Sequence, residues 1–178
     1  MSGPEERRTT TAIASSLAGT IDWRAAYEQH APDLVRFLRR LVRSDESAQD
    51  LVQDTFVRAL RAGRTPPQAE LRPWLFRIAS NLALDELRRG KRFAFLPFTS
   101  AQRTEAPSFE EVDQIRHALR SIAPEQALAL TLALHEGFSR REIAGMTGVS
   151  EETVKSRLAR GRLAFAAAYE RIEKGGKR

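Results

Sequence analysis

The chain has 178 residues, 42% of them hydrophobic, which suffices for one ordinary domain or two small ones with modest cores. It contains no cysteine, which excludes disulfides, thiolate metal sites and redox sensing by the chain itself. A formal net charge of +6 favours a polyanionic partner without identifying one. No stretch approaches the ~20 apolar residues of a transmembrane helix, and the N-terminus lacks the apolar run of a signal peptide. We therefore expect a cytoplasmic protein without membrane insertion.

The charges are distributed unevenly along the chain. Residues 45–58 hold four acids against one base, whereas residues 153–178 hold eight bases against two acids. The first half therefore presents an acidic surface and the end of the chain a basic one, which suits two different partners.

Residues 1–20 are rich in Thr, Ser, Ala and Gly, and we expect them to form a disordered arm. Apolar residues at helical spacing then predict a first helix over Trp23–Val42. The next helix is expected to begin at Ser47, with Asp50 three residues later completing a capping box, and to end near Leu60.

A loop follows over residues 62–72, because a glycine and two prolines interrupt the helical pattern. Pro73 suits the first turn of a third helix, which is expected to end near Gly90.

The next stretch, residues 91–110, has no sustained period and predicts a linker. It is unusually apolar for a connector, with Phe93, Phe95, Leu96 and Phe98. We expect this cluster to dock on a domain and keep the free chain compact; alternatively, one or two of its phenylalanines complete the core of the first domain.

The helical pattern resumes at about Glu111 and continues in a second helix that begins at Pro124. Ser139 is expected to cap the next helix, and Ser150 the last one, which reaches about Glu173. No stretch of useful length alternates between apolar and polar residues with the period of two that is typical of a β-strand. The sequence therefore predicts an all-α fold.

The helices are expected to form two small domains that are joined by a flexible linker. The first would cover residues 21–90 and the second residues 111–178, with residues 91–110 between them.

The residues from Arg140 to Arg162 have the pattern of a helix-turn-helix. Ala144 is small where the two backbones approach, Gly148 supplies a positive φ angle in the turn, and Val154 fills the small core. Hydrogen-bonding and basic side chains are left on the outside of the second helix: Glu152, Lys155, Ser156 and Arg160. Arg157 and Arg162 flank them at positions that would meet the phosphates of a DNA groove. Such a helix can enter a major groove of DNA. The alternative is a solvated charged helix in which Gly148 is an ordinary C-cap.

Three stretches together resemble one family. They are "SAQDLVQDTFVRALR" (47–61), "RPWLFRIASNLALDELRR" (72–89) and "APEQALALTLALHEGFSRREIAGMTGVSEETVKSRLARGR" (123–162). In this order and spacing they resemble sigma factors of bacterial RNA polymerase, of the small extracytoplasmic-function (ECF) type. The resemblance implies a first domain that reads the −10 promoter element and a second that reads the −35 element. It also implies binding to core RNA polymerase and control by an anti-sigma factor.

The helix that begins at Ser47 has an acidic and amide face, which suits a basic protein helix better than DNA. In the family this stripe docks on the clamp helices of the largest polymerase subunit, which assigns core-polymerase binding to Asp50, Gln53, Asp54 and Val57. For Asp50, helix capping is an alternative or additional role. For Gln53 and Asp54 the alternative is a solvated face.

In the family, the helix that begins at Pro73 and the loop before it meet the −10 element. The residues that this assigns to DNA are Arg77, Asn81, Asp85, Arg88 and Arg89. Asn81 can offer an amide to an unpaired base while the arginines neutralise phosphates. Asp85 can equally pair with a neighbouring arginine, and Trp74 can stack on a base, although an aromatic residue at the start of a helix more often belongs to the core.

An enzyme is not expected. The three histidines are scattered, and no phosphate-binding glycine loop or recognisable catalytic set is present, so no catalytic residue, metal ligand or cofactor is predicted. Two other readings remain open at this point: a dimeric helix-turn-helix regulator that binds a palindrome alone, and an adaptor that only binds proteins.

Overall fold

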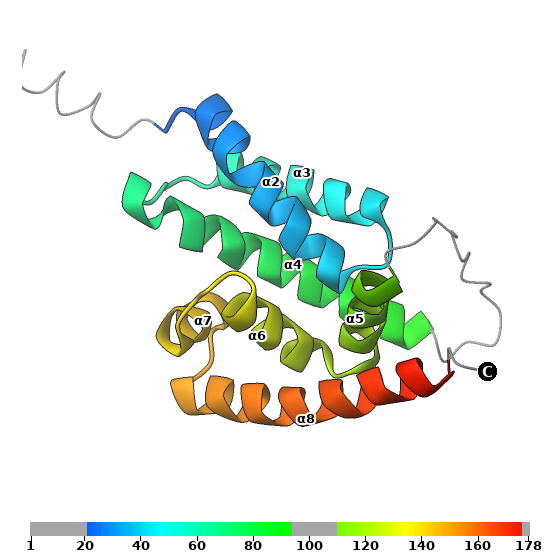
Figure 1. The fold of residues 1–178 in the computed structure, drawn as a ribbon. Coiled ribbons are helices and arrows are strands. Elements are labelled where there is room, and N and C mark those ends of the chain that lie inside the picture. The colour runs from blue at the N-terminus through cyan, green and yellow to red at the C-terminus, as the bar shows by residue number, and fades with distance from the viewer. Residues whose placement is uncertain (1–20, 94–109, 176–178) are drawn as a thin grey trace, which may run out of the picture.

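The computed structural model describes residues 21–93 and 110–175, and within these ranges the regular elements are all helical (Figure 1), which confirms the predicted all-α fold. The described part of the first half holds three α-helices and a short 3-10 helix at Gln68–Glu70: α2 (Trp23–Leu41), α3 (Asp45–Arg61) and α4 (Leu71–Phe93). The second half holds four: α5 (Glu110–Ser121), α6 (Pro124–Leu134), α7 (Arg140–Thr147) and α8 (Glu151–Gly175).

The start of α3 differs from the prediction. The helix begins at Asp45, and its N-cap is Ser44, whose hydroxyl accepts a hydrogen bond from the Ser47 amide at 3.0 Å. The predicted capping box of Ser47 and Asp50 is therefore wrong, and Asp50 is an exposed residue inside the helix. With Ser44 as the cap, Asp45 and Glu46 fall in the first turn, where carboxylates stabilise the positive end of the helix dipole.

The end of α4 also lies beyond its predicted position. The helix continues through Gly90 to Phe93, because a single glycine lowers helix stability without ending a helix that its neighbours hold in place. The other apolar linker residues, Phe95, Leu96 and Phe98, lie outside the described residues, as does the N-terminal arm.

The predicted turn between the last two helices is confirmed. Gly148 is the C-cap of α7 in the left-handed conformation, with φ of 67°, and its amide donates to the carbonyl of Ala144. Ser139 caps α7 in a complete capping box with Glu142, and the hydroxyl of Ser150 accepts from the Thr153 amide at the start of α8. Local side-chain chemistry thus fixes both ends of this motif.

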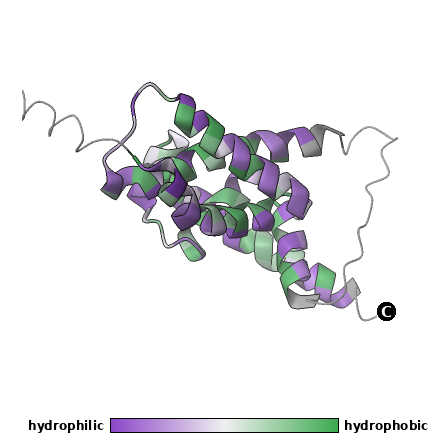
Figure 2. Cartoon of the chain, turned by 90° about the horizontal axis from the view of Figure 1, so that it is seen from above, coloured by the Kyte–Doolittle hydropathy of each residue, from purple (hydrophilic) through white to green (hydrophobic). Residues whose placement is uncertain are grey.

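The two halves pack against each other along α4, which lies between α2 and α3 on one side and α6 and α7 on the other (Figure 1). Phe76 of α4 is fully buried at this junction. Its ring centroid is 5.2 Å from that of Phe37 in α2 and 5.1 Å from that of Phe138, which follows α6. One buried apolar cluster therefore runs through both halves, while hydrophilic residues colour much of the outer helix faces (Figure 2).

The close approach of α6 and α8 depends on Gly161. A Cβ atom there would lie 3.2 Å from Gln126 Cβ and 3.2 Å from Leu130 Cδ1. We expect Gly161→Val to lower the free energy of unfolding by about 1–3 kcal/mol, because the extra methyl groups force the helices apart. The matched control is Gly145→Val in α7, where nothing lies within 4 Å of the added Cβ and the change should stay below about 0.5 kcal/mol. Urea unfolding of both variants measures this, and equal losses would contradict the predicted helix contact.

Acidification is expected to destabilise the fold through His30. Burial lowers the pKa of His30 below its ordinary value. The negative charge of Asp33 opposes this shift, and the positive charge of Arg72 adds to it. Near pH 6 the unfolded state therefore binds more protons than the folded state, so stability falls as the pH falls through this range. Burial and the charge of Arg40 also lower the pKa of His135, which acts in the same direction. The melting temperature should fall between pH 7.5 and pH 5.5. We expect this fall to be smaller for His30→Gln than for the wild type, and smaller still for His30→Gln/His135→Gln. The same pH dependence in all three proteins would refute this assignment.

Candidate nucleic-acid and protein interfaces

The outer face of α8 carries the side chains that sequence analysis assigned to DNA. Val154 and Leu158 are buried against the rest of the second half. The opposite side of the helix exposes Glu152, Lys155, Arg160 and Arg162, with Ser156 and Arg157 half-buried at its edges. Lys155 and Glu152 form an ion pair of 3.4 Å between neighbouring turns, which is weak at this exposure and easily exchanged for a phosphate contact.

Arg160 and Arg162 occupy different sides of this face. At 100° per residue they lie about 160° apart around the helix axis, so they cannot contact the same atoms of a ligand. Arg160 donates from Nε to the carbonyl of Ser156 at 3.5 Å, which directs its guanidinium back towards the first turns of α8. The two arginines are therefore suited to different contacts with one ligand.

A second exposed face lies on α3. Asp50, Gln53, Asp54 and Val57 all point to solvent, on the side of the helix opposite Val52 and Ala59, which are buried. The first three are polar, and Val57 is 41% exposed, so this face joins carboxylates to an apolar spot.

Two apolar residues beside this face were missed by sequence analysis. Leu60 of α3 is 56% exposed and lies one turn beyond Val57. Tyr27 of α2 is 46% exposed, and its ring centroid is 4.8 Å from that of Phe56. The spacing of Gln53, Val57 and Leu60 could have revealed the extension, because residues at i, i+4 and i+7 share one helix face; Tyr27 required the tertiary structure.

A third exposed face runs along α4. Arg77, Asn81, Asp85, Arg88 and Arg89 are all exposed, and the first three follow one another at intervals of four residues. Trp74 lies on the same side but is half-buried against the core, with its ring centroid 6.5 Å from that of Trp23, which supports the core role. In the described part of the chain, no ion pair joins Asp85 to Arg88 or Arg89.

The partner of Arg88 lies in the other half of the molecule. Its Nη2 atom is 2.8 Å from Oε1 of Glu125 at the start of α6, and its Nε atom donates to the same oxygen at 3.1 Å. Burial opposes ionisation of Glu125, but the hydrogen bonds and charge of Arg88, with the charge of Arg157, hold its pKa below the ordinary value. The guanidinium of Arg88, the fourth residue of the α4 face, is thus bound to a carboxylate in this arrangement.

Arg72 makes a similar contact at the other end of α4. Its Nη2 atom is 3.3 Å from a carboxylate oxygen of Glu136 and donates to the carbonyl of that residue at 3.2 Å. Its guanidinium carbon lies 4.8 Å from the ring centroid of Phe76 and 4.5 Å from that of Phe138. The Glu136 side chain is only 9% exposed, and burial raises its pKa despite the neighbouring arginines. Sequence analysis missed this cluster because its members are 64 positions apart.

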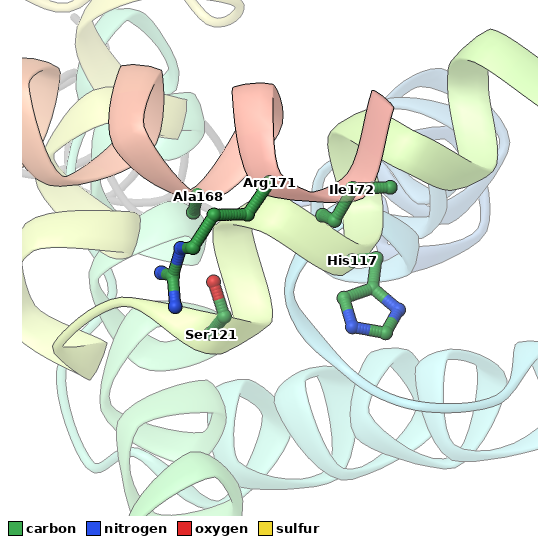
Figure 3. A pocket seen from close by; sticks show the side chains of 5 residues that line it. All are labelled: His117, Ser121, Ala168, Arg171 and Ile172. Atoms are coloured by element: carbon green, nitrogen blue, oxygen red, sulfur yellow. The ribbon is translucent and has the colours of Figure 1, made fainter. Parts of the chain in front are cut away.

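A small hollow of ≈170 Å³ lies between α5 and α8 (Figure 3). The residues that line it are His117, Ser121, Ala168, Arg171 and Ile172. The guanidinium of Arg171 is held by the carbonyl of Ala167, to which Nε donates at 3.2 Å. Neither the residues that line this hollow nor its volume indicates a particular ligand.

No helix within the described ranges is long and apolar enough to cross a membrane.

Comparison with known proteins gives matches in both halves. The family model for Sigma-70 region 2 matches residues 26–93, and the model for Sigma-70 region 4 matches residues 113–165. RNA polymerase sigma factor CarQ of Myxococcus xanthus is 34% identical over 142 residues, which is 76% of this chain and 82% of CarQ. ECF RNA polymerase sigma factor SigM of Mycobacterium tuberculosis is 35% identical over 173 residues, which is 92% of this chain and 86% of SigM.

Two solved structures share the fold. CnrH, solved in complex with the cytosolic domain of CnrY, superposes with a TM-score of 0.64 and 26% identity, over 83% of this chain and 87% of CnrH. The sigma factor RpoE of Bartonella quintana, solved with the anti-sigma factor NepR, superposes with a TM-score of 0.61 and 26% identity, over 84% of this chain and 97% of RpoE.

Proposed function

Because the chain belongs to the ECF sigma factors of bacterial RNA polymerase, we propose that it binds core polymerase and directs it to promoters with defined −10 and −35 elements. The observation that carries this function is the ordered match to region 2 and region 4, joined to a complete helix-turn-helix in the second. We propose a region 2 domain over residues 21–90 and a region 4 domain over residues 111–178, with a linker between them. The protein would act in the cytoplasm as an initiation factor, with no catalytic step or cofactor of its own.

The α3 face is the proposed contact with core polymerase. Asp50, Gln53 and Asp54 offer carboxylates and an amide to a basic helix, while Val57 offers an apolar spot. Leu60 and Tyr27 extend this spot, because large apolar side chains that remain exposed often mark protein contacts. Polar groups around exposed apolar anchors are the usual make-up of a protein interface.

The α4 face is the proposed contact with the −10 element. An exposed amide at Asn81 can bind the edge of an unpaired base, and the exposed cations at Arg77, Arg88 and Arg89 can neutralise phosphates around it. Trp74 packs near Trp23, and we assign it a structural role in support of this face.

The outer face of α8 is the proposed contact with the −35 element. The side chains with hydrogen-bonding groups on its first turns, Glu152, Lys155 and Ser156, are suited to base edges in a major groove. The arginines at positions 157, 160 and 162 surround them and supply the cations for phosphates or guanine.

We further propose control by an anti-sigma factor. RpoE of Bartonella quintana, which matches this chain over most of its length, was solved in complex with the anti-sigma factor NepR. A regulator that covers the faces of α3 and α4 would prevent both core binding and promoter binding.

The test is a promoter-binding assay with and without core polymerase. A DNA library should yield a bound promoter with two separate elements only when core polymerase is present. A dimeric regulator would instead select a palindrome from the library without polymerase. A pure adaptor protein would select no sequence under either condition.

A further inference from the structure

The outer face of α8 continues past the polar side chains that we assign to base edges. At 100° per residue, four exposed or half-buried positions fall within about 60° of one another around the helix axis, on the side opposite the buried Val154 and Leu158. We call this line the α8 crest; its members are Glu152, Ser156, Ala159 and Leu163. The first two are polar and the last two are apolar, so the chemistry of the crest changes after Ser156.

The apolar end of the α8 crest is not explained by packing within the protein. Leu163 is 75% exposed, the largest exposed fraction among the large apolar side chains that the structure describes. Ala159 is also exposed, one turn earlier. Because Cα–Cβ bonds in a helix tilt toward its N-terminus, the Leu163 side chain is directed back toward the turn that holds Ala159. The two residues therefore form one patch, with a short side chain beside a long one.

Cations flank the α8 crest on both sides. Arg160 lies about 70° to one side of its middle, while Lys155 lies about 70° and Arg162 about 90° to the other side. All three side chains are exposed. When the crest faces the base edges of a major groove, these cations lie toward the two walls of the groove, which carry the phosphates. The apolar patch is therefore continuous with the proposed contact to the −35 element.

The size of the patch favours DNA over a protein as its partner. A stable protein interface buries about 800 Å² on each partner, far more than two side chains supply. A thymine, by contrast, presents a single C5-methyl group in the major groove, and small apolar side chains such as alanine are suited to it. The short Ala159 lets the helix approach the bases closely, and Leu163 can shield the methyl group from water.

We propose that the patch of Ala159 and Leu163 binds the C5-methyl group of a thymine in the −35 element and that these two residues thereby contribute to promoter specificity. This inference rests on the proposed function and specifies one base of the element. It requires an A·T pair next to the bases that Glu152 and Ser156 contact, with the thymine on either strand. Loss of the methyl group should weaken binding about fourfold, which corresponds to the ~0.8 kcal/mol of one buried methylene-sized group.

The test replaces thymidine by deoxyuridine, which removes only the methyl group. The full chain with core polymerase is bound to a promoter that this complex selects, and each thymidine of the −35 element is replaced in turn, on both strands. The wild type should bind about fourfold more weakly when one particular thymidine is replaced. In the variant Ala159→Gly/Leu163→Ala, the ratio of the two dissociation constants at that position should fall to about one. Lower helix stability in the variant affects both duplexes alike, so it leaves this ratio unchanged.

The matched control is Leu134→Ala, which truncates a leucine that is 61% exposed at the end of a different helix, α6. It should keep the wild-type ratio at every position. Deoxyuridine also alters the shape of the duplex slightly, but that effect does not depend on the protein variant. A penalty that persists in Ala159→Gly/Leu163→Ala would therefore show that the patch does not bind the methyl group.

Two further results would overturn the inference: equal binding of the thymidine and deoxyuridine duplexes by the wild type at every position, or a selected −35 element without an A·T pair. If the polymerase complex selects no promoter, the proposed function itself is refuted. A selected promoter without any effect of the methyl group refutes only this inference.

Discussion

Replacing Asp54 by arginine is expected to weaken binding to core RNA polymerase by at least about tenfold. Asp54 is exposed in the middle of the α3 face, so its substitution leaves the buried side of the helix unchanged. A cation there would be placed against the basic helix that we propose as the partner, and like charges across an interface oppose association. Fluorescence anisotropy with labelled chain and purified core polymerase measures the effect.

The control for this variant is Glu28→Arg, at an exposed position of α2 whose ion-pair partner among the described residues is Arg24. It has the same change in charge and should bind core as the wild type does. Circular dichroism should show equal helicity in both variants. Equal core affinity of Asp54→Arg and Glu28→Arg would exclude the α3 face as the polymerase contact.

Removing Arg160 and removing Arg162 are expected to change promoter binding in different ways. Arg160→Ala should reduce affinity and, if the side chain binds a base edge, do so at one position of the −35 element by ~1–3 kcal/mol. Arg162→Ala should weaken binding to all sequences alike and reduce the slope of log affinity against log salt by about one unit. The reason is their separation around α8, which prevents both from reaching the same atoms.

Binding of the polymerase complex to a set of −35 variants at several salt concentrations distinguishes the two effects. Each variant retains the buried residues of α8, so the helix should remain folded. Identical sequence profiles and identical salt slopes for the two variants would show that their roles have been assigned wrongly.

The helices and the helix-turn-helix could be predicted because their determinants are local. The positive φ of Gly148, the Ser139 cap and the burial of Val154 each follow from residue type and spacing within a few positions. The start of α3 was harder, because Ser44 and Ser47 can both cap a helix and lie three residues apart. The dipole interaction of two acidic residues favours the earlier start.

The packing of the two halves could not be predicted in this way. Arg72 and Glu136 meet across 64 positions, and no periodic pattern identifies the residue that faces an arginine so far along the chain. The side chain of Arg88 shows the consequence. Sequence analysis assigned it to DNA and gave an ion pair with Arg88 or Arg89 as an alternative role of Asp85, whereas the fold brings Glu125 of α6 against Arg88.

Direct contacts between the described helices were not anticipated from the sequence as a source of compactness. The Phe-rich linker was expected to dock on a domain, but its central residues lie outside the described ranges. The described helices contact each other directly, through the rings of Phe76 and Phe138 and through two ion pairs, Arg72 with Glu136 and Arg88 with Glu125.

The most direct test of the central claim is run-off transcription with purified core polymerase and a promoter selected by the complex. The account predicts a transcript of defined length only when this chain is added, and its loss when either the −10 or the −35 element is scrambled. No transcript from the intact promoter, or an equal yield with both elements scrambled, would contradict the assignment of this chain as a promoter-directing sigma factor.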